Sequence, residues 1–265
     1  KAFTALQACL REAPDDIDTI LELERMAQAA GLWNDLVAEY AQLIQSMSGA
    51  QAATHWLRLG RWYAQELGHR ENAIASFKQA IALDGSQVEA YAGLAEALQG
   101  GERWGDLVEI LEKQVKLETE PTKQFELWLT LGDVHEARLA QPAQAVAAYH
   151  QALAIEPDST DAMGALERLF RRSGNWRDLC ELLEKRALMA TDGGAAADFR
   201  HEIGEIRADR LDDPAGAITV LEGIVADHPR RAATLRTLAK LYATPGRMAD
   251  YLRTLDRLVE AADSD

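Results

Sequence analysis

The chain has 265 residues and a formal net charge of −15 at pH 7. This acidic balance argues against nucleic acid or an anionic membrane as the partner, because basic surfaces bind both. Two cysteines exclude a disulfide scaffold and a cysteine-rich metal site. No apolar run approaches the roughly 20 residues of a membrane-spanning helix, and the amino end does not resemble a signal peptide. We therefore expect no membrane insertion and a cytoplasmic location.

The composition predicts an all-α protein. Alanine, the residue with the highest helix propensity, occurs 47 times, whereas glycine occurs 18 times and proline 7 times. No stretch shows the alternating Val, Ile, Thr and Tyr pattern of strands. In chain order we expect helices near residues 1–13, 15–30, 33–46, 51–67, 71–84, 87–99, 103–117, 121–139, 143–155, 159–173, 175–189, 193–211, 214–227, 231–244 and 247–263.

Tryptophan residues mark an internal repeat. Trp33, Trp104 and Trp176 stand in similar short segments, and Met248 takes the same place in a weaker fourth copy. The spacings between these residues are 71, 72 and 72. A period of this length accommodates two helical hairpins of about 36 residues each. A second family of similar segments has the same period and covers residues 56–63, 128–135 and 200–207.

These segments resemble the tetratricopeptide repeat family, whose motif places Trp, Leu-Gly and Tyr on a first helix and small and aromatic residues on a second. One hairpin matches this motif at Trp56, Leu59, Gly60, Tyr63, Ala73, Phe77 and Ala80. Another matches at Trp128, Leu131, Gly132, Ala145, Tyr149, Ala152 and Pro157. The alternate hairpins keep the Leu and the turn Gly but depart by carrying Leu or Tyr at the family's first small position.

The resemblance covers essentially the whole chain. It implies a right-handed α-α superhelical solenoid of about seven stacked hairpins plus an orphan first helix. We expect residues 1–265 to form a single solenoid that is a fragment of a longer repeat protein, because a hairpin cannot bury its apolar face without a stacked neighbour. The high alanine content and the excess of Arg over Lys favour a bacterial gene.

Glycine and proline fit the expected turns and helix starts. A Gly on the first helix lets the second helix approach closely, because Gly has no side chain. Gly31, Gly174 and Gly246 provide the conformation needed between helices. Pro142 and Pro214 begin second helices, where a missing N–H is harmless.

The helix expected near residues 1–13 resembles the second helix of a hairpin, and the first helix of that hairpin is missing. Cys9 and Cys180 lie in different repeats and are expected to be small packing residues. The alignment of the first helix pairs Ala2, Leu6 and Cys9 with Ala73, Phe77 and Ala80 at a shift of 71 residues.

The sequence offers little that is typical of an enzyme. No phosphate-binding loop, dinucleotide-binding or nucleophile motif occurs, and we expect no catalytic residue, cofactor or metal. His201 and Glu205 lie four residues apart, which is half of a metal site, but the absence of further ligands favours a surface pair. The periodic tryptophans are expected to pack in the core. Trp62 has no aromatic counterpart in the other repeats, so packing and binding are equally open for it.

The family resemblance also implies a binding site. In the family, the first helices line a concave groove that holds peptides or partner proteins. The matching positions here carry charges whose sign alternates in blocks, which fits either a solvated face or a groove that recognises an oppositely patterned partner. The candidate partner-binding residues are Arg58, Arg61, Glu96, Asp133, Glu136, Arg168, Arg171, Arg172, His201, Glu205, Arg236 and Lys240.

We therefore expect a non-catalytic interaction scaffold that binds a partner protein or peptide in the groove. Two alternatives stay open: a regulatory or substrate-docking segment of a larger enzyme, and a structural array that self-associates through uncapped ends. The family's carboxylate clamp uses Asn residues that the matching positions lack, and Glu89 and Glu96 are acidic. A receptor for chaperone tails is therefore not expected.

Overall fold

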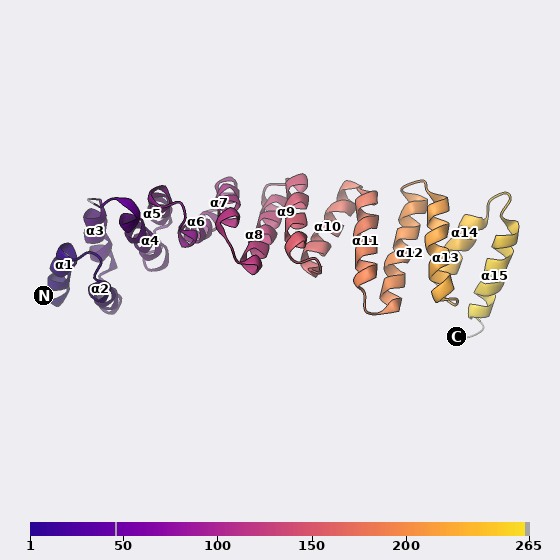
Figure 1. Cartoon of the computed structure of the whole chain (residues 1–265), viewed down its shortest axis with the longest axis horizontal. Helices are drawn as coiled ribbons and strands as arrows, with labels where there is room; N and C mark the ends of the chain where they lie inside the picture. The colour runs from indigo at the N-terminus through magenta and orange to yellow at the C-terminus, as the bar shows by residue number, and fades with distance from the viewer. Residues whose placement is uncertain (46, 263–265) are drawn as a thin grey trace. The chain divides into compact units, whose positions relative to one another are not determined.

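The computed structural model of the chain describes residues 1–45 and 47–262, and every regular element in those residues is helical (Figure 1). The chain divides into two compact units, Lys1–Ile155 and Glu156–Asp265. Within each unit, consecutive helices pack against each other as hairpins. Each unit thus has the architecture of an α-α solenoid.

The first unit holds one unpaired helix followed by four hairpins. We call α2, α4, α6 and α8 first helices, and α3, α5, α7 and α9 second helices; α1 is a second helix. The bounds are α1 (Ala2–Glu12), α2 (Ile17–Ala30), α3 (Trp33–Ile44), α4 (Gly49–Gln65), α5 (Arg70–Leu83), α6 (Val88–Gly100), α7 (Trp104–Leu117), α8 (Pro121–Asp133), a π-helical turn (Val134–Arg138) and α9 (Pro142–Ile155).

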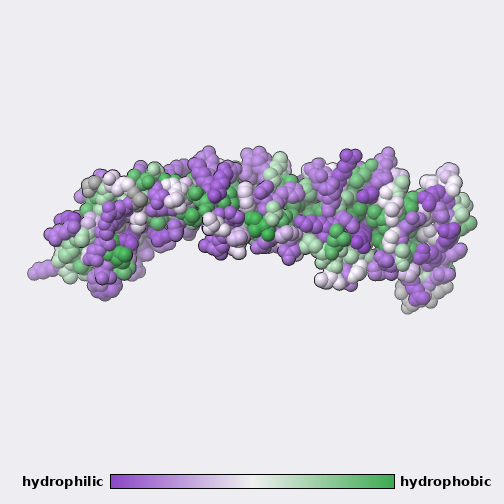
Figure 2. All heavy atoms as spheres, viewed as in Figure 1, coloured by the Kyte–Doolittle hydropathy of each residue, from purple (hydrophilic) through white to green (hydrophobic). Residues whose placement is uncertain are grey.

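The second unit holds three hairpins, whose first helices are α10, α12 and α14. The bounds are α10 (Thr160–Ser173), α11 (Trp176–Met189), α12 (Gly193–Asp209), α13 (Pro214–Asp227), α14 (Ala232–Tyr242) and α15 (Met248–Ala262). Hydrophilic side chains cover most of the face seen in Figure 2, with hydrophobic ones visible between them.

The prediction of the helices is confirmed to within a few residues, with one exception. The helix expected over residues 121–139 ends as an α-helix at Asp133 and finishes with the π-helical turn. No proline or glycine lies between Val134 and Arg138 to signal this turn in the sequence.

In three hairpins, a Gly on the first helix lies in close contact with a large side chain on the second helix. A Cβ atom added to Gly60 would lie 2.6 Å from the Phe77 ring, and one added to Gly132 would lie 2.4 Å from the Tyr149 ring. Gly204 has the same relation to Leu221, with 2.6 Å to its Cδ2. The predicted role of Gly in the close approach of the two helices is therefore confirmed.

The turns between the helices of the alternate hairpins need a left-handed residue. Gly31, Gly174 and Gly246 occupy this position with φ angles of 67°, 74° and 90°. The equivalent residue in the remaining hairpin is Glu102, with a φ of 56°. An L-residue with a side chain pays a steric cost of roughly 1–2 kcal/mol in this conformation.

Replacing Glu102 with Gly is therefore expected to stabilise the first unit by about 1 kcal/mol, because Gly adopts the left-handed conformation without that cost. Urea unfolding followed by circular dichroism measures the change. The reciprocal control is Gly174→Ala in the second unit, which is expected to lower stability. A loss of stability in Glu102→Gly would contradict the role assigned to this turn.

The register expected for α1 is confirmed, but the packing role expected for Cys9 is wrong. Helix α1 buries Phe3 and Leu10, whereas Cys9 is exposed. The alignment shift of 71 holds, because α1 ends at Glu12 and α5 at Leu83, and the backbone bond from Ala13 N–H to Cys9 O corresponds to that from Asp84 N–H to Ala80 O. Cys9 is exposed because α1 lacks, among the described residues, a first helix in the place that α4 has beside α5. Cys9 is not a packing residue, whereas Cys180 is buried as expected.

The periodic tryptophans Trp33, Trp104 and Trp176 lie at the edge of the core rather than in its centre. Trp33 and Trp104 are half-buried and pack against the core clusters of the first unit. The guanidinium of Arg138 lies 4.8 Å from the ring centre of Trp104. Arg210 has the same relation to Trp176 at 5.0 Å in the second unit. These pairs lie one 72-residue period apart and add cation–π attraction to apolar packing.

Trp62 packs in the core, which is one of the two roles, packing and binding, that the sequence leaves open for it. Its side chain is buried and lies 6.0 Å from Trp33, ring centre to ring centre. Its indole N–H donates a hydrogen bond of 2.9 Å to Glu24 on α2. Trp62 thus connects α4 to the preceding hairpin.

Candidate functional site

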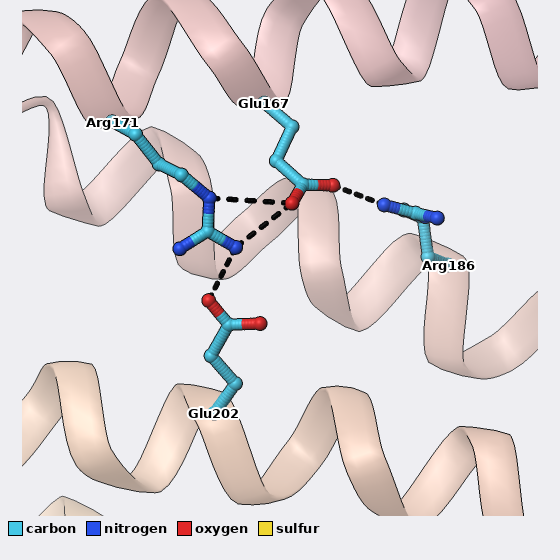
Figure 3. A network of polar contacts seen from close by, with 4 residues as sticks. All are labelled: Glu167, Arg171, Arg186 and Glu202. Atoms are coloured by element: carbon cyan, nitrogen blue, oxygen red, sulfur yellow. Dashed lines mark hydrogen bonds and ion pairs between the residues drawn. The ribbon is translucent and has the colours of Figure 1, made fainter.

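Figure 3 shows a network of charges that joins three helices of the second unit. Glu167 on α10 accepts hydrogen bonds from Arg171, one turn along the same helix, at 3.2 Å and 2.8 Å. The other carboxylate oxygen of Glu167 pairs with Arg186 on α11. Arg171 also pairs with Glu202 on α12. Arg171, which the sequence predicts to bind a partner, therefore links the neighbouring first helices α10 and α12.

The next pair of first helices in this unit is joined in the same way. Asp198 on α12 pairs with Arg231 at the start of α14. The His201 ring lies 3.3 Å from the Thr234 hydroxyl of α14 and 3.4 Å from Glu205, its neighbour one turn along α12. The surface pair expected for His201 and Glu205 is present. The other predicted residues of the second unit are exposed on α10 and α14, namely Arg168, Arg172, Arg236 and Lys240.

Three predicted residues of the first unit lie against buried tyrosines. The Tyr149 hydroxyl donates to Asp133 at 2.7 Å and to Glu136 at 3.3 Å. Burial, followed by these two carboxylates, raises the pKa of Tyr149. Burial likewise raises the pKa of Tyr40 to about 12, and the charge of half-buried Arg58 opposes this rise. These three charges are thus engaged within the fold.

The remaining two predicted residues, Arg61 and Glu96, line one pocket. This pocket has a volume of about 500 Å³ and lies between α4, α5 and α6. The Phe77 ring forms its floor, wedged between Gly60 of α4 and Gly93 of α6; a Cβ on either Gly would lie 2.6 Å from the ring. Small residues form much of the wall, namely Ala64, Gly68, Ala92, Gly93, Ala97 and Gly100.

Four charged side chains surround this pocket. Arg61 comes from α4 and Arg70 from the first turn of α5, whereas Glu89 and Glu96 lie two turns apart on α6. Within residues 1–45 and 47–262, none of the four forms a hydrogen bond or an ion pair. The pocket thus combines a small-residue wall with two basic side chains from α4 and α5 and two acidic side chains from α6, all available to a ligand.

The sequence pattern does not predict two elements of this pocket, Arg70 and Gly93. The groove positions do not include Arg70, because they lie on first helices and Arg70 begins a second helix. Gly93 alone gives no signal in the sequence, because a Gly inside a helix lowers stability on its own. Its role appears only in the structure, where the Phe77 ring lies against it. The run of small residues in positions 92–101 was the signal in the sequence.

Two further findings concern the residues that the structure describes. None of their helices combines the length and the apolar composition needed to cross a membrane. Likewise, no group of three or more His, Cys, Asp or Glu side chains among them is arranged to hold a metal ion.

Comparison with known proteins identifies both kinds of hairpin. Residues 54–87, which span α4 and α5, match a sequence model of the tetratricopeptide repeat. Residues 162–196, which span α10 and α11, match a second model of the same repeat. The two matches together sample each of the alternating hairpin types that make up the 72-residue period.

Longer proteins carry similar sequences. Superkiller protein 3 of Schizosaccharomyces pombe is 24% identical over 285 aligned positions, which cover 100% of this chain and 19% of that protein. Cellulose synthase operon protein C of Xanthomonas axonopodis pv. citri is 30% identical over 164 positions, which cover 58% of this chain and 10% of that protein. The chain therefore spans about a fifth or less of the length of these relatives.

A solved structure supports the fold. A chain in the structure of Naa15/Naa10 bound to HypK-THB has a TM-score of 0.54 and 13% identity, covering 99% of this chain and 40% of that one. At this identity the likeness concerns the fold alone. The two repeat matches and the stacked hairpins together show that the chain contains tetratricopeptide repeats, which in general serve as scaffolds for protein–protein interaction.

Proposed function

We propose that the chain is a non-catalytic scaffold that binds a segment of a partner protein on the face formed by its first helices. The pocket between α4, α5 and α6 is its main contact in this proposal. The observation that carries the proposal is the group of four charged side chains around that pocket, which have no partner among the described residues.

The contrast with the second unit supports this choice of site. There, charged residues of neighbouring first helices pair with each other, as Arg171 does with Glu202 and Asp198 with Arg231. Such pairs must be broken before a partner can use them. At the pocket, Arg61 and Glu96 have no such pairs to break in the described part of the chain. A ligand that pairs with them therefore does not have to displace an existing partner.

The charges also define the chemistry of the partner. A segment with an acidic group near Arg61 and Arg70 and a basic group near Glu89 and Glu96 would complement the rim. The small residues of the wall leave room for an apolar side chain between the two charges. Complementary charges of this kind increase the association rate and the selectivity more than the affinity itself.

Internal repetition supplies a variant that blocks the pocket with little risk to the fold. Position 92 is Ala in α6, and the equivalent position two periods later is Arg236 in α14, where the arginine is exposed. Ala and Arg also have similar helix propensities. Ala92→Arg should therefore fill the pocket while α6 stays folded.

The test selects short random peptides that bind the full chain and compares their affinity for variants. Ala92→Arg is expected to weaken binding about tenfold or more, the equivalent of about 1.4 kcal/mol. Ala75→Arg, the same change at an exposed position of α5 outside the pocket, is the matched control. Selected peptides that lack an acidic and a basic residue, or that bind Ala92→Arg as well as the unchanged chain, would contradict the proposal.

A further inference from the structure

The last helix of the second unit carries an uncovered apolar stripe. Met248, Leu252 and Val259 of α15 are 62%, 54% and 60% exposed, and Leu255 between them is half-buried. Their spacing of four, three and four residues places all four on one side of the helix. The opposite side of α15 packs on the unit through Thr254 and Ala261, which are both buried. The stripe is therefore a second apolar face.

The repeat shows what covers this face elsewhere in the chain. Leu252, Leu255 and Val259 have equivalent residues in each earlier period of the repeat. These equivalents lie on α11, one period before, and on α7 and α3, two and three periods before. These helices are each followed by a first helix that packs against them: α12, α8 and α4. All of these equivalent residues are buried except Val108, which is half-buried. They are Cys180, Leu183 and Ala187 on α11, Val108, Leu111 and Val115 on α7, and Val37, Tyr40 and Ile44 on α3.

We propose that the α15 face is an interface for the first helix of a further hairpin, carried by the polypeptide that follows residue 265. The inference goes beyond partner binding at the pocket and does not depend on it. The connections support the placement: α7 ends at Leu117 and α8 begins at Pro121, and α11 ends at Met189 and α12 begins at Gly193. With a connection of the same length, a helix after α15, which ends at Ala262, begins close to position 266.

The type of helix at each end of the chain argues against a second copy as the occupant. The stripe on α15 has the pattern that receives a first helix, whereas the helix at the other end, α1, is a second helix. Stacking two copies end to end would place a second helix on a second helix. The chain matches only part of its longer relatives, 19% of one and 10% of the other.

The test extends the chain along its natural reading frame by one hairpin and measures hydrogen exchange of the α15 amides. We expect exchange to slow about tenfold or more in the extended chain, because covering a face stabilises the helix against local opening. Leu252→Glu with Val259→Glu should remove this protection. The same pair should change exchange little in residues 1–265 alone, where both side chains are exposed.

The matched control is Arg253→Glu, which makes the same change of −2 in charge on the side of α15 away from the stripe, where the side chain is 73% exposed. It should leave the protection in place. A reading frame that ends at residue 265, or an extension that leaves α15 exchange unchanged, would overturn the proposal. So would a dimer of residues 1–265 that Leu252→Glu with Val259→Glu dissociates, because a second copy would then cover the face.

Discussion

Replacing Gly132 with Ala is expected to destabilise the first unit by about 1–3 kcal/mol, the usual cost of overpacking a core. The added Cβ would lie 2.4 to 2.7 Å from three atoms of the Tyr149 ring, and the ring is held in place by its hydrogen bonds to Asp133 and Glu136. Neither α8 nor the ring can therefore relax cheaply. Urea unfolding monitored by circular dichroism gives the change in free energy.

The same substitution should have the opposite sign at Gly105. A Cβ added there meets nothing within 4 Å, so Gly105→Ala should stabilise α7 by up to about 1 kcal/mol through helix propensity alone. A double-mutant cycle isolates the clash: in a Tyr149→Ala background, Gly132→Ala should lose most of its cost. If Gly132→Ala and Gly105→Ala changed stability equally, the close approach of α8 and α9 would be refuted.

Phe77→Ala is expected to cost about 3–5 kcal/mol, the range for removing a buried aromatic ring. The ring is 1% exposed and fills the space that Gly60 and Gly93 leave between α4 and α6. Two glycines have no side chains with which to refill that space, so the cavity persists. The cost is again measured by urea unfolding of the full chain, in the transition of the first unit.

Phe77→Leu provides a graded comparison, because the equivalent residue two periods later is Leu221, opposite Gly204. It should cost less than about 1.5 kcal/mol, as hydrophobic exchanges of similar volume do. Lys78→Ala, at the exposed neighbour on α5, should be close to neutral. The packing assigned to Phe77 would be wrong if its removal cost no more than that of Lys78.

Most of the fold was predictable from local patterns. The tryptophan spacing and the Leu-Gly pairs gave the hairpins, because both features reflect contacts inside one hairpin or between adjacent ones. The turn glycines were predictable for the same reason. The exposure of Cys9 was not, because its alignment with buried Ala80 of α5 implied a covered position, whereas α1 lacks, among the described residues, a first helix in the place that α4 has beside α5.

The site was predictable only in part, because the sign of a charge does not say what it pairs with. Arg171 and Arg61 looked alike in the sequence, as basic residues on first helices. Arg171 has Glu202 within reach on the next first helix, whereas Arg61 has a pocket beside it. That difference depends on side-chain positions across helices more than 30 residues apart, which periodicity alone does not determine.

The alternation of the two hairpin types has a consequence for how such a chain can change length in evolution. The contacts that define each hairpin, such as Gly60 with Phe77 and Gly132 with Tyr149, recur one 72-residue period apart. Duplicating or deleting a whole period therefore joins surfaces that already fit, whereas a change of half a period would place two hairpins of the same type side by side. The unit by which such a chain can lengthen or shorten without disturbing its packing is therefore the pair of hairpins.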